Sequence, residues 1–189
     1  MIFDLNNKPP NCLIEKATDV CIVGGGTAGI YLAQALQQRN VNVVLVECGG
    51  NSIVNADSVF LKPEFTATEY KGASLGRFAG LGGTSAKWGG QMISLSDSDF
   101  QNKSQLDGSS AWPINNTDLE IYYEKVLKTL QMNDPKAYSF SNTKTAKLIL
   151  RSKLSTAFNL RSSSWIPFRK RNFAKKFHSV MKKSKNLEV

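Results

Sequence analysis

A short apolar run that opens directly into a glycine-rich turn constrains this chain more than any other feature. Residues 20–23 are apolar, and Gly24, Gly26 and Gly29 follow in the spacing Gly-x-Gly-x-x-Gly. A helical pattern begins at Thr27, so the order is strand, turn, helix. Glycines in such a turn let the main chain approach a pyrophosphate, and the helix N-terminus offers N–H groups to the phosphates. The segment therefore predicts a dinucleotide-binding turn.

An acidic residue at the end of the next apolar run extends this pattern. Glu47 follows residues 43–46 and lies 21 positions after Gly26, close to the roughly 20 expected for a carboxylate that bonds the adenosine ribose. A carboxylate here repels a 2′-phosphate, so the pattern favours NAD or FAD over NADP. The alternatives are a solvated acid at Glu47 and a tight turn that binds nothing.

The helix after the turn is expected to pack closely on the sheet. Its periodicity puts one set of side chains on a common face, namely Ala28, Leu32, Ala35 and Leu36. The small residues at Ala28 and Gly29 favour a close approach to the first strand.

A second glycine-rich segment spans residues 76–90 and contains six glycines. That density excludes an ordinary helix, because each interior glycine costs about 1 kcal/mol relative to alanine. We interpret the segment as a loop that wraps a flat or charged group at close range. The hydroxyls of Thr84 and Ser85 and the N–H groups from Gly82 onward are candidates to hold a phosphate or a flavin edge. A short helix capped by Thr84 or Ser85, or a purely structural loop, are the alternatives.

Together the two motifs resemble the glucose–methanol–choline family of FAD-dependent oxidoreductases, most closely its bacterial branch. The second motif carries most of the likeness, as Gly80-Leu81-Gly82-Gly83-Thr84-Ser85-x-x-Trp88-Gly89-Gly90. The likeness covers roughly residues 17–132 and continues through Asp99-Phe100, Trp112-Pro113-Ile114, Leu119 and Tyr122-Tyr123.

This resemblance implies an α/β fold of the FAD/NAD(P)-binding, Rossmann-like, three-layer kind, with FAD as the cofactor. It also implies that an alcohol, with a sugar as one candidate, passes a hydride to the flavin. The residues that it assigns to the cofactor come from both motifs: Gly24, Gly25, Gly26, Thr27, Ala28, Gly29, Glu47, Arg77, Gly82, Gly83, Thr84 and Ser85. For Arg77 a surface ion pair is an equal alternative. Trp88 is expected either near the ring system or in the core.

The catalytic part of that family has no counterpart in this sequence. Family members use a histidine near the C-terminus as base, whereas the one histidine here, His178, lies in a basic helical stretch and is expected at the surface. No catalytic residue and no metal ligand is therefore predicted, and we expect this chain alone to be inactive. Residues 186–189 look like the start of a strand. We therefore expect an incomplete N-terminal fragment, either truncated or completed by a separately encoded C-terminal half.

Three regions are predicted along the chain. Residues 1–17 form a polar arm, residues 18–100 the Rossmann-like FAD-binding region, and residues 101–189 the start of a partly helical middle or substrate region. Within these regions, residues 51–75 and 97–113 are expected to be irregular.

Two helices are predicted in the last region. The first covers residues 118–131, with Thr117 and Glu120 as a capping box. Its apolar stripe is Leu119, Tyr122, Tyr123, Val126, Leu127 and Leu130. The second covers residues 170–185 and is basic and amphipathic, with Phe173, Phe177, Val180 and Met181 on its apolar side.

The positive charge is concentrated near the C-terminus. The net charge is +9, and residues 141–189 hold 13 basic side chains against the single acid Glu188. A basic block can bind nucleic acid or an anionic membrane, which gives the alternative function of an interaction module. We prefer the interpretation that this basic block is a face whose acidic partners lie on another part of the protein. No nucleic acid is therefore expected, and association with a membrane surface stays open.

The cysteines and the N-terminal sequence bear on the compartment. Cys12, Cys21 and Cys48 form no C-x-x-C pair, so neither a zinc site nor a disulfide framework is indicated. Cys21 is predicted to lie in the core and Cys48 to line the adenosine pocket. No secretory signal or membrane span is apparent, which favours the cytoplasm.

Overall fold

The computed structural model describes most of the chain, in the ranges 1–7, 17–55, 63–73, 75–101, 111–132 and 163–189. These residues form two compact units, one of Met1–Trp88 with Arg169–Val189 and one of Gly89–Phe168. The predicted arm beyond residue 7 and the basic segment before residue 163 lie outside the described residues.

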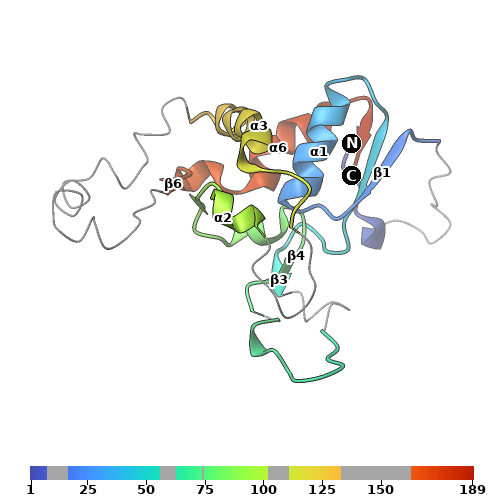
Figure 1. Cartoon of the computed structure of the whole chain (residues 1–189). Helices are drawn as coiled ribbons and strands as arrows, with labels where there is room; N and C mark the ends of the chain where they lie inside the picture. The colour runs from blue at the N-terminus through green and yellow to red at the C-terminus, as the bar shows by residue number, and fades with distance from the viewer. Residues whose placement is uncertain (8–16, 56–62, 74, 102–110, 133–162) are drawn as a thin grey trace. The chain divides into compact units, whose positions relative to one another are not determined.

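The first unit is built on a parallel three-stranded sheet in the order β1-β2-β7. β1 (Val20–Val23) pairs with β2 (Val43–Val46), and α1 (Thr27–Gln37) makes the crossover between them (Figure 1). β7 (Leu187–Glu188) adds to the other edge of β2, which confirms the strand predicted after the basic helix. The expected Rossmann-like α/β fold is therefore confirmed.

Two helices cover one face of this sheet, and the face of α1 differs from the one predicted. α1 buries Ile30 and Ala33, each 1% exposed, whereas Leu32 is 48% exposed and Ala28 is also exposed. The prediction was wrong because Gly29 must face the carbonyl oxygen of Gly24, where any side chain would collide. Because positions 30 and 33 lie on the same side of the helix as Gly29, their side chains also face inward.

The second covering helix is α6 (Phe173–Lys183), which packs beside α1 (Figure 1). It buries Phe173, Phe177 and Met181, so the predicted amphipathic helix is confirmed. Asn172 caps its N-terminus by accepting from the Lys175 N–H at 3.0 Å. A short 3-10 turn, Phe168–Lys170, precedes it.

The opposite face of the sheet is exposed in the part of the chain that the structure describes. Val23 is 85% exposed and Val46 46% exposed, and Cys21 is exposed as well. The prediction that Cys21 lies in the core was wrong. Successive strand residues alternate between faces, so Cys21 lies opposite to the buried Ile22. Parallel sheets normally have both faces covered.

The N-terminal residues return to the sheet at β7, so the two ends of the chain lie side by side (Figure 1). The Phe3 N–H donates to the Val189 carbonyl at 2.7 Å, and the Val189 N–H donates to the Met1 carbonyl at 2.8 Å. A 3-10 turn, Leu5–Asn7, follows, and the Asp4 carboxylate accepts from the Asn6 N–H at 3.1 Å. Residues 1–7 therefore form an ordered arm on the first unit.

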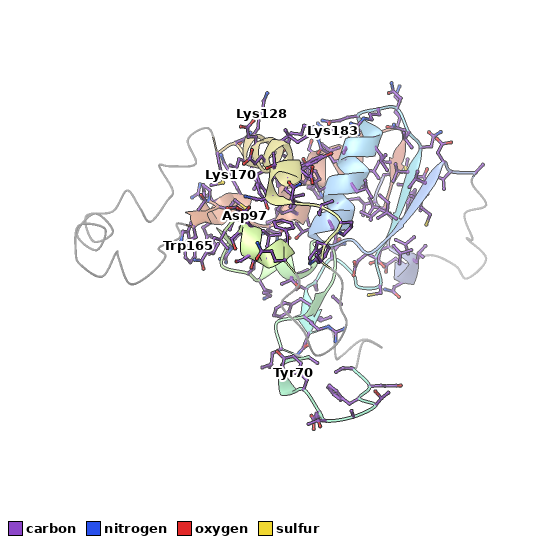
Figure 2. All side chains as sticks on the ribbon, in the orientation of Figure 1. Tyr70, Asp97, Lys128, Trp165, Lys170 and Lys183 are labelled. Atoms are coloured by element: carbon purple, nitrogen blue, oxygen red, sulfur yellow. The ribbon has the colours of Figure 1, made fainter. Side chains whose placement is uncertain are left out.

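Between the two glycine motifs the chain forms a small antiparallel ladder. β3 (Val54–Asn55) pairs with β4 (Phe78–Ala79), so the segment predicted to be irregular over 51–75 contains a strand. A 3-10 turn, Lys71–Ala73, lies in the connecting loop. Tyr70 lies at its edge and is 71% exposed (Figure 2).

Within the described residues of the second unit, the chain forms the helices α2 and α3 and a short ladder. β5 (Gln91–Met92) pairs antiparallel with β6 (Ser164–Trp165). α2 (Asp97–Phe100) occupies the start of the segment that was predicted to be a loop. Ser96 begins it, because the Asp99 carboxylate accepts from the Ser96 N–H at 2.7 Å.

α3 (Asn116–Thr129) is the helix predicted over 118–131, but its cap differs. Asn115 and Asp118 form the capping box, in place of Thr117 and Glu120. An Asn/Asp pair at the same spacing forms the same kind of reciprocal hydrogen bonds, and it does so two positions earlier in the sequence. The expected apolar stripe is only partly buried: Leu130 is 1% exposed, whereas Tyr122 is 53% exposed.

Candidate functional site

The first glycine turn presents bare main chain in front of a helix N-terminus. Gly24 has a φ of +106°, and its N–H donates to the Val46 carbonyl at 2.7 Å. A Cβ atom built on Gly24 or on Gly26 would meet nothing within 4 Å. α1 starts at Thr27 with no side-chain cap and no acid in its first turn. Open space beside uncapped N–H groups fits an anionic diphosphate, because the helix end carries partial positive charge.

Glu47 joins this turn to two other segments. Its Oε2 accepts from the Gly25 N–H at 2.7 Å, and its Oε1 accepts from the Gly49 and Gly80 N–H groups, both at 3.0 Å. One carboxylate thus satisfies three main-chain donors from three parts of the chain. Hydrogen bonds to a charged acceptor are worth about 1.5–3 kcal/mol each. This bridging was not predicted, because spacing alone pointed only to a ribose contact.

The second glycine motif packs directly on the first turn. The Gly82 N–H donates to the Gly25 carbonyl at 2.8 Å, and the Leu81 N–H donates to the Gly50 carbonyl at 3.1 Å. A Cβ atom on Gly83 would lie 3.1 Å from the Gly26 Cα. The two motifs, far apart in the sequence, are therefore in contact, as a single cofactor spanning both requires.

The hydroxyls of the second motif have different surroundings. Ser85 is 2% exposed, and its Oγ donates to the Gly82 carbonyl at 2.6 Å and accepts from the Phe173 N–H at 3.2 Å. Thr84 is exposed, and its Oγ1 donates to the Gly76 carbonyl at 3.4 Å. Neither caps the 3-10 helix Gly83–Ala86. The Ser85 hydroxyl is used within the protein, which leaves Thr84 as the accessible one.

The remaining predicted residues of this motif bond to main-chain carbonyls. Arg77 Nη1 donates to the Ala73 carbonyl at 3.3 Å, so its guanidinium is held by its own loop. Trp88 Nε1 donates to the Arg171 carbonyl at 2.9 Å and is half-buried. Trp88 thus joins the motif to the segment that leads into α6. A contact of either side chain with a cofactor stays a prediction.

A cavity of about 380 Å³ lies beside Glu47. Cys48 lines this cavity, and its predicted place in an adenosine pocket stays a prediction. Burial and the neighbouring Glu47 carboxylate raise the pKa of the Cys48 thiol. The thiol is therefore less reactive near neutral pH than an ordinary cysteine.

A second cavity, of about 590 Å³, lies between the loop at residues 51–53 and the start of α6. Lys87, Lys175 and His178 contribute to its lining. His178 is exposed, as predicted.

Two searches within the described ranges gave negative results. No group of three or more His, Cys, Asp or Glu side chains there is arranged to hold a metal ion. Nor does any helix in those ranges combine the length and the apolar character needed to cross a membrane.

Comparison with known proteins supports the nucleotide assignment. Residues 17–64 match the family model described as FAD binding domain, and no curated protein matches the chain. The matched residues contain β1, the first glycine turn, α1 and β2 with Glu47. The match does not extend to the second glycine motif, which carries most of the likeness to the glucose–methanol–choline family. Residues 17–64 are an FAD-binding domain of the kind found in flavoprotein oxidoreductases, and FAD is its cofactor.

Proposed function

We propose that this chain is the FAD-binding portion of an oxidoreductase of the glucose–methanol–choline kind, which oxidises the CH–OH group of an alcohol. The observation that carries this proposal is the hydrogen bond of the Gly82 N–H to the Gly25 carbonyl at 2.8 Å. It brings the motif responsible for the family resemblance against the turn of the FAD-binding domain. A sugar or sugar-derived alcohol is the substrate class that this resemblance favours.

Each part of the site has a proposed role in holding the cofactor. Gly24, Gly26 and the first turn of α1 hold the diphosphate, because their main chain is open and uncapped. Glu47 holds the ribose in this proposal. Its carboxylate accepts from three N–H groups and from the Cys48 thiol at 3.5 Å, and we expect a ribose hydroxyl to replace the weak thiol donor. Thr84 lies on the side expected to face the flavin. When bound, the flavin supplies hydride acceptance.

We propose that a second polypeptide completes the enzyme. The exposed sheet face at Cys21 and Val23 is the surface that it would cover, and a catalytic base would come with it. A cytoplasmic location is part of this proposal, and the free thiols of Cys21 and Cys48 support it.

Cofactor binding is the direct test. The untagged chain is titrated with FAD, and quenching of flavin fluorescence is followed, with FMN as the control ligand. Turnover is then measured with a dye acceptor and a panel of alcohols, alone and with added cell extract. We expect FAD to bind more tightly than FMN, and the chain alone to show no turnover. Absence of FAD binding, or robust turnover by the isolated chain, would contradict the proposal.

A basic interaction module is the second candidate. Residues 169–185 hold eight lysine and arginine residues and no acid, and Lys170 and Lys183 mark the two ends of this segment (Figure 2). Burial, and to a lesser degree the nearby Lys170, lowers the pKa of Lys176. Co-sedimentation with anionic vesicles and a gel shift with single-stranded nucleic acid, both at low salt, separate the candidates. Absence of binding in both assays would contradict the proposal of a basic interaction module.

A further inference from the structure

The cavity beside Glu47 has a wall that the dinucleotide motif does not supply. Its lining comes partly from the loop after β2 and partly from the first residues of the chain. Ile2, Phe3 and Leu5 lie on the N-terminal side, and Val46, Cys48 and Leu81 lie on the domain side. Two segments that the sequence separates by some forty positions therefore enclose one space.

Main-chain hydrogen bonds fix the N-terminal arm Met1–Asn7 in this position. Besides the two bonds with Val189, the Met1 nitrogen donates to the Met181 carbonyl at 2.9 Å and to the Leu187 carbonyl at 2.6 Å. The arm is thus bound to the end of α6 and to the sheet strand β7. These bonds do not involve the side chains of Phe3 and Leu5, so substitutions there leave the anchoring bonds in place.

The chemistry of the lining suits a purine. Apolar residues of the arm and of the domain line the cavity, and Asp4, Asn6 and Asn51 add polar residues that can bond the edge of a base. Glu47, the residue proposed to bond a ribose, lies in the same lining. A base attached to that ribose must lie within a few ångströms of the carboxylate, and this cavity adjoins it.

We propose that the N-terminal arm is the outer wall of the adenosine pocket, with the adenine of FAD lying against Phe3. This inference rests on the proposed function, because it places one part of the same cofactor. The arm then contributes to the preference for FAD over FMN, which has no adenosine.

The first test is a substitution that removes the Phe3 ring and keeps the main-chain hydrogen bonds that hold the arm. Phe3→Ala is compared with Phe65→Ala, which removes the same ring from a site 39% exposed and outside both cavities. Base–aromatic stacking is worth about 1–3 kcal/mol, so we expect Phe3→Ala to weaken ADP and FAD binding about five-fold or more. FMN binding is expected to be unchanged in both variants. Equal ADP affinity in the two variants overturns the inference.

The second test needs no variant and uses the thiols of the intact chain. Cys48 lines the cavity, whereas Cys21 lies on the exposed sheet face and lines neither cavity. Alkylation of each cysteine is followed by peptide mass spectrometry with and without ADP. We expect ADP to slow alkylation of Cys48 several-fold and to leave Cys21 unchanged. FAD binding without ADP protection of Cys48 overturns the inference and leaves the proposed function intact, whereas absence of both ADP and FAD binding overturns both.

Discussion

Glycine has opposite roles in the two glycine-rich turns of the first unit. At the first turn, the positions of Gly24 and Gly26 have no atom within 4 Å of an added Cβ. At the second, a Cβ on Gly80 would lie 2.8 Å from the Ser52 carbonyl oxygen, and one on Gly82 would lie 3.0 Å from the Ala174 Cβ. At these positions the first turn leaves space for a ligand, whereas the second turn packs directly against neighbouring segments of the protein.

Glycine density by itself therefore does not identify a ligand contact. Residues 76–90 were expected to wrap a cofactor at close range, and that contact stays a prediction. Left-handed backbone, with φ of +121° at Gly80 and +104° at Gly82, and the close packing of neighbouring segments require glycine at these two positions whether or not a cofactor is bound. A glycine is required wherever a side chain is excluded, whether the excluding atom belongs to a ligand or to the protein.

The largest expected effect separates packing from binding within the first turn. Gly29→Ala puts a methyl group against the Gly24 carbonyl, and we expect it to destabilise the apoprotein by about 3 kcal/mol or more. Gly26→Ala enters open space at a φ of −79°. It is expected to cost under about 1 kcal/mol and yet to weaken FAD binding at least ten-fold. Thermal melts and FAD titrations measure both. Unchanged FAD affinity in Gly26→Ala would show that no phosphate lies there.

The next effect concerns the residue that joins the two turns. Glu47→Gln replaces one carboxylate oxygen by an amide donor, which faces a main-chain N–H and leaves it unsatisfied. We expect a loss of about 2–3 kcal/mol in urea unfolding of the apoprotein. Asp19→Asn is the matched control, since Asp19 accepts from one exposed N–H, that of Asn42, at 2.8 Å. Equal stability of the two variants would mean that the Glu47 bridge contributes little.

Packing in the second turn is tested by two glycines that share a positive φ. Gly82→Ala places its methyl group against Ala174, whereas Gly76→Ala, at a φ of +73°, meets nothing within 4 Å. Left-handed backbone costs about 1–2 kcal/mol in either variant. Gly82, at a φ of +104°, lies further than Gly76 from the left-handed region that other residues tolerate, so backbone strain and the contact both act against Gly82→Ala. We expect Gly82→Ala to melt at the lower temperature. If Gly76→Ala were the less stable variant, the second turn would not be the packed one.

The smallest effect distinguishes the two hydroxyls of that turn. Ser85→Ala leaves the Phe173 N–H without its acceptor, and a loss of about 1–2 kcal/mol is expected. Thr84→Ala changes an exposed side chain and is expected to stay within about 0.5 kcal/mol of the parent. Denaturation midpoints give both values, and FAD titration of the Thr84 variant shows whether its hydroxyl meets the cofactor. The reverse order of stability would contradict the observed burial.

Local patterns predicted much of the first unit. The strand–turn–helix–strand order, the position of Glu47 and the amphipathic α6 were all correct, because spacing along a strand or helix fixes which side chains share a face. The face of α1 and the cap of α3 were wrong. The first error came from counting hydrophobic residues while Gly29 decided the orientation, and the second from choosing Thr117 when Asn115 offered the same chemistry two residues earlier.

The sequence by itself determined that a bare turn, a helix N-terminus and an acid stand in the order that a dinucleotide needs, since these features lie within one short stretch. Only the tertiary structure decided that Glu47 bridges three loops, that the Ser85 hydroxyl is buried against Phe173, and that the N-terminal arm encloses the cavity. Those contacts join residues that are far apart in the chain. No local spacing encodes them, because they exist only once the layers have packed.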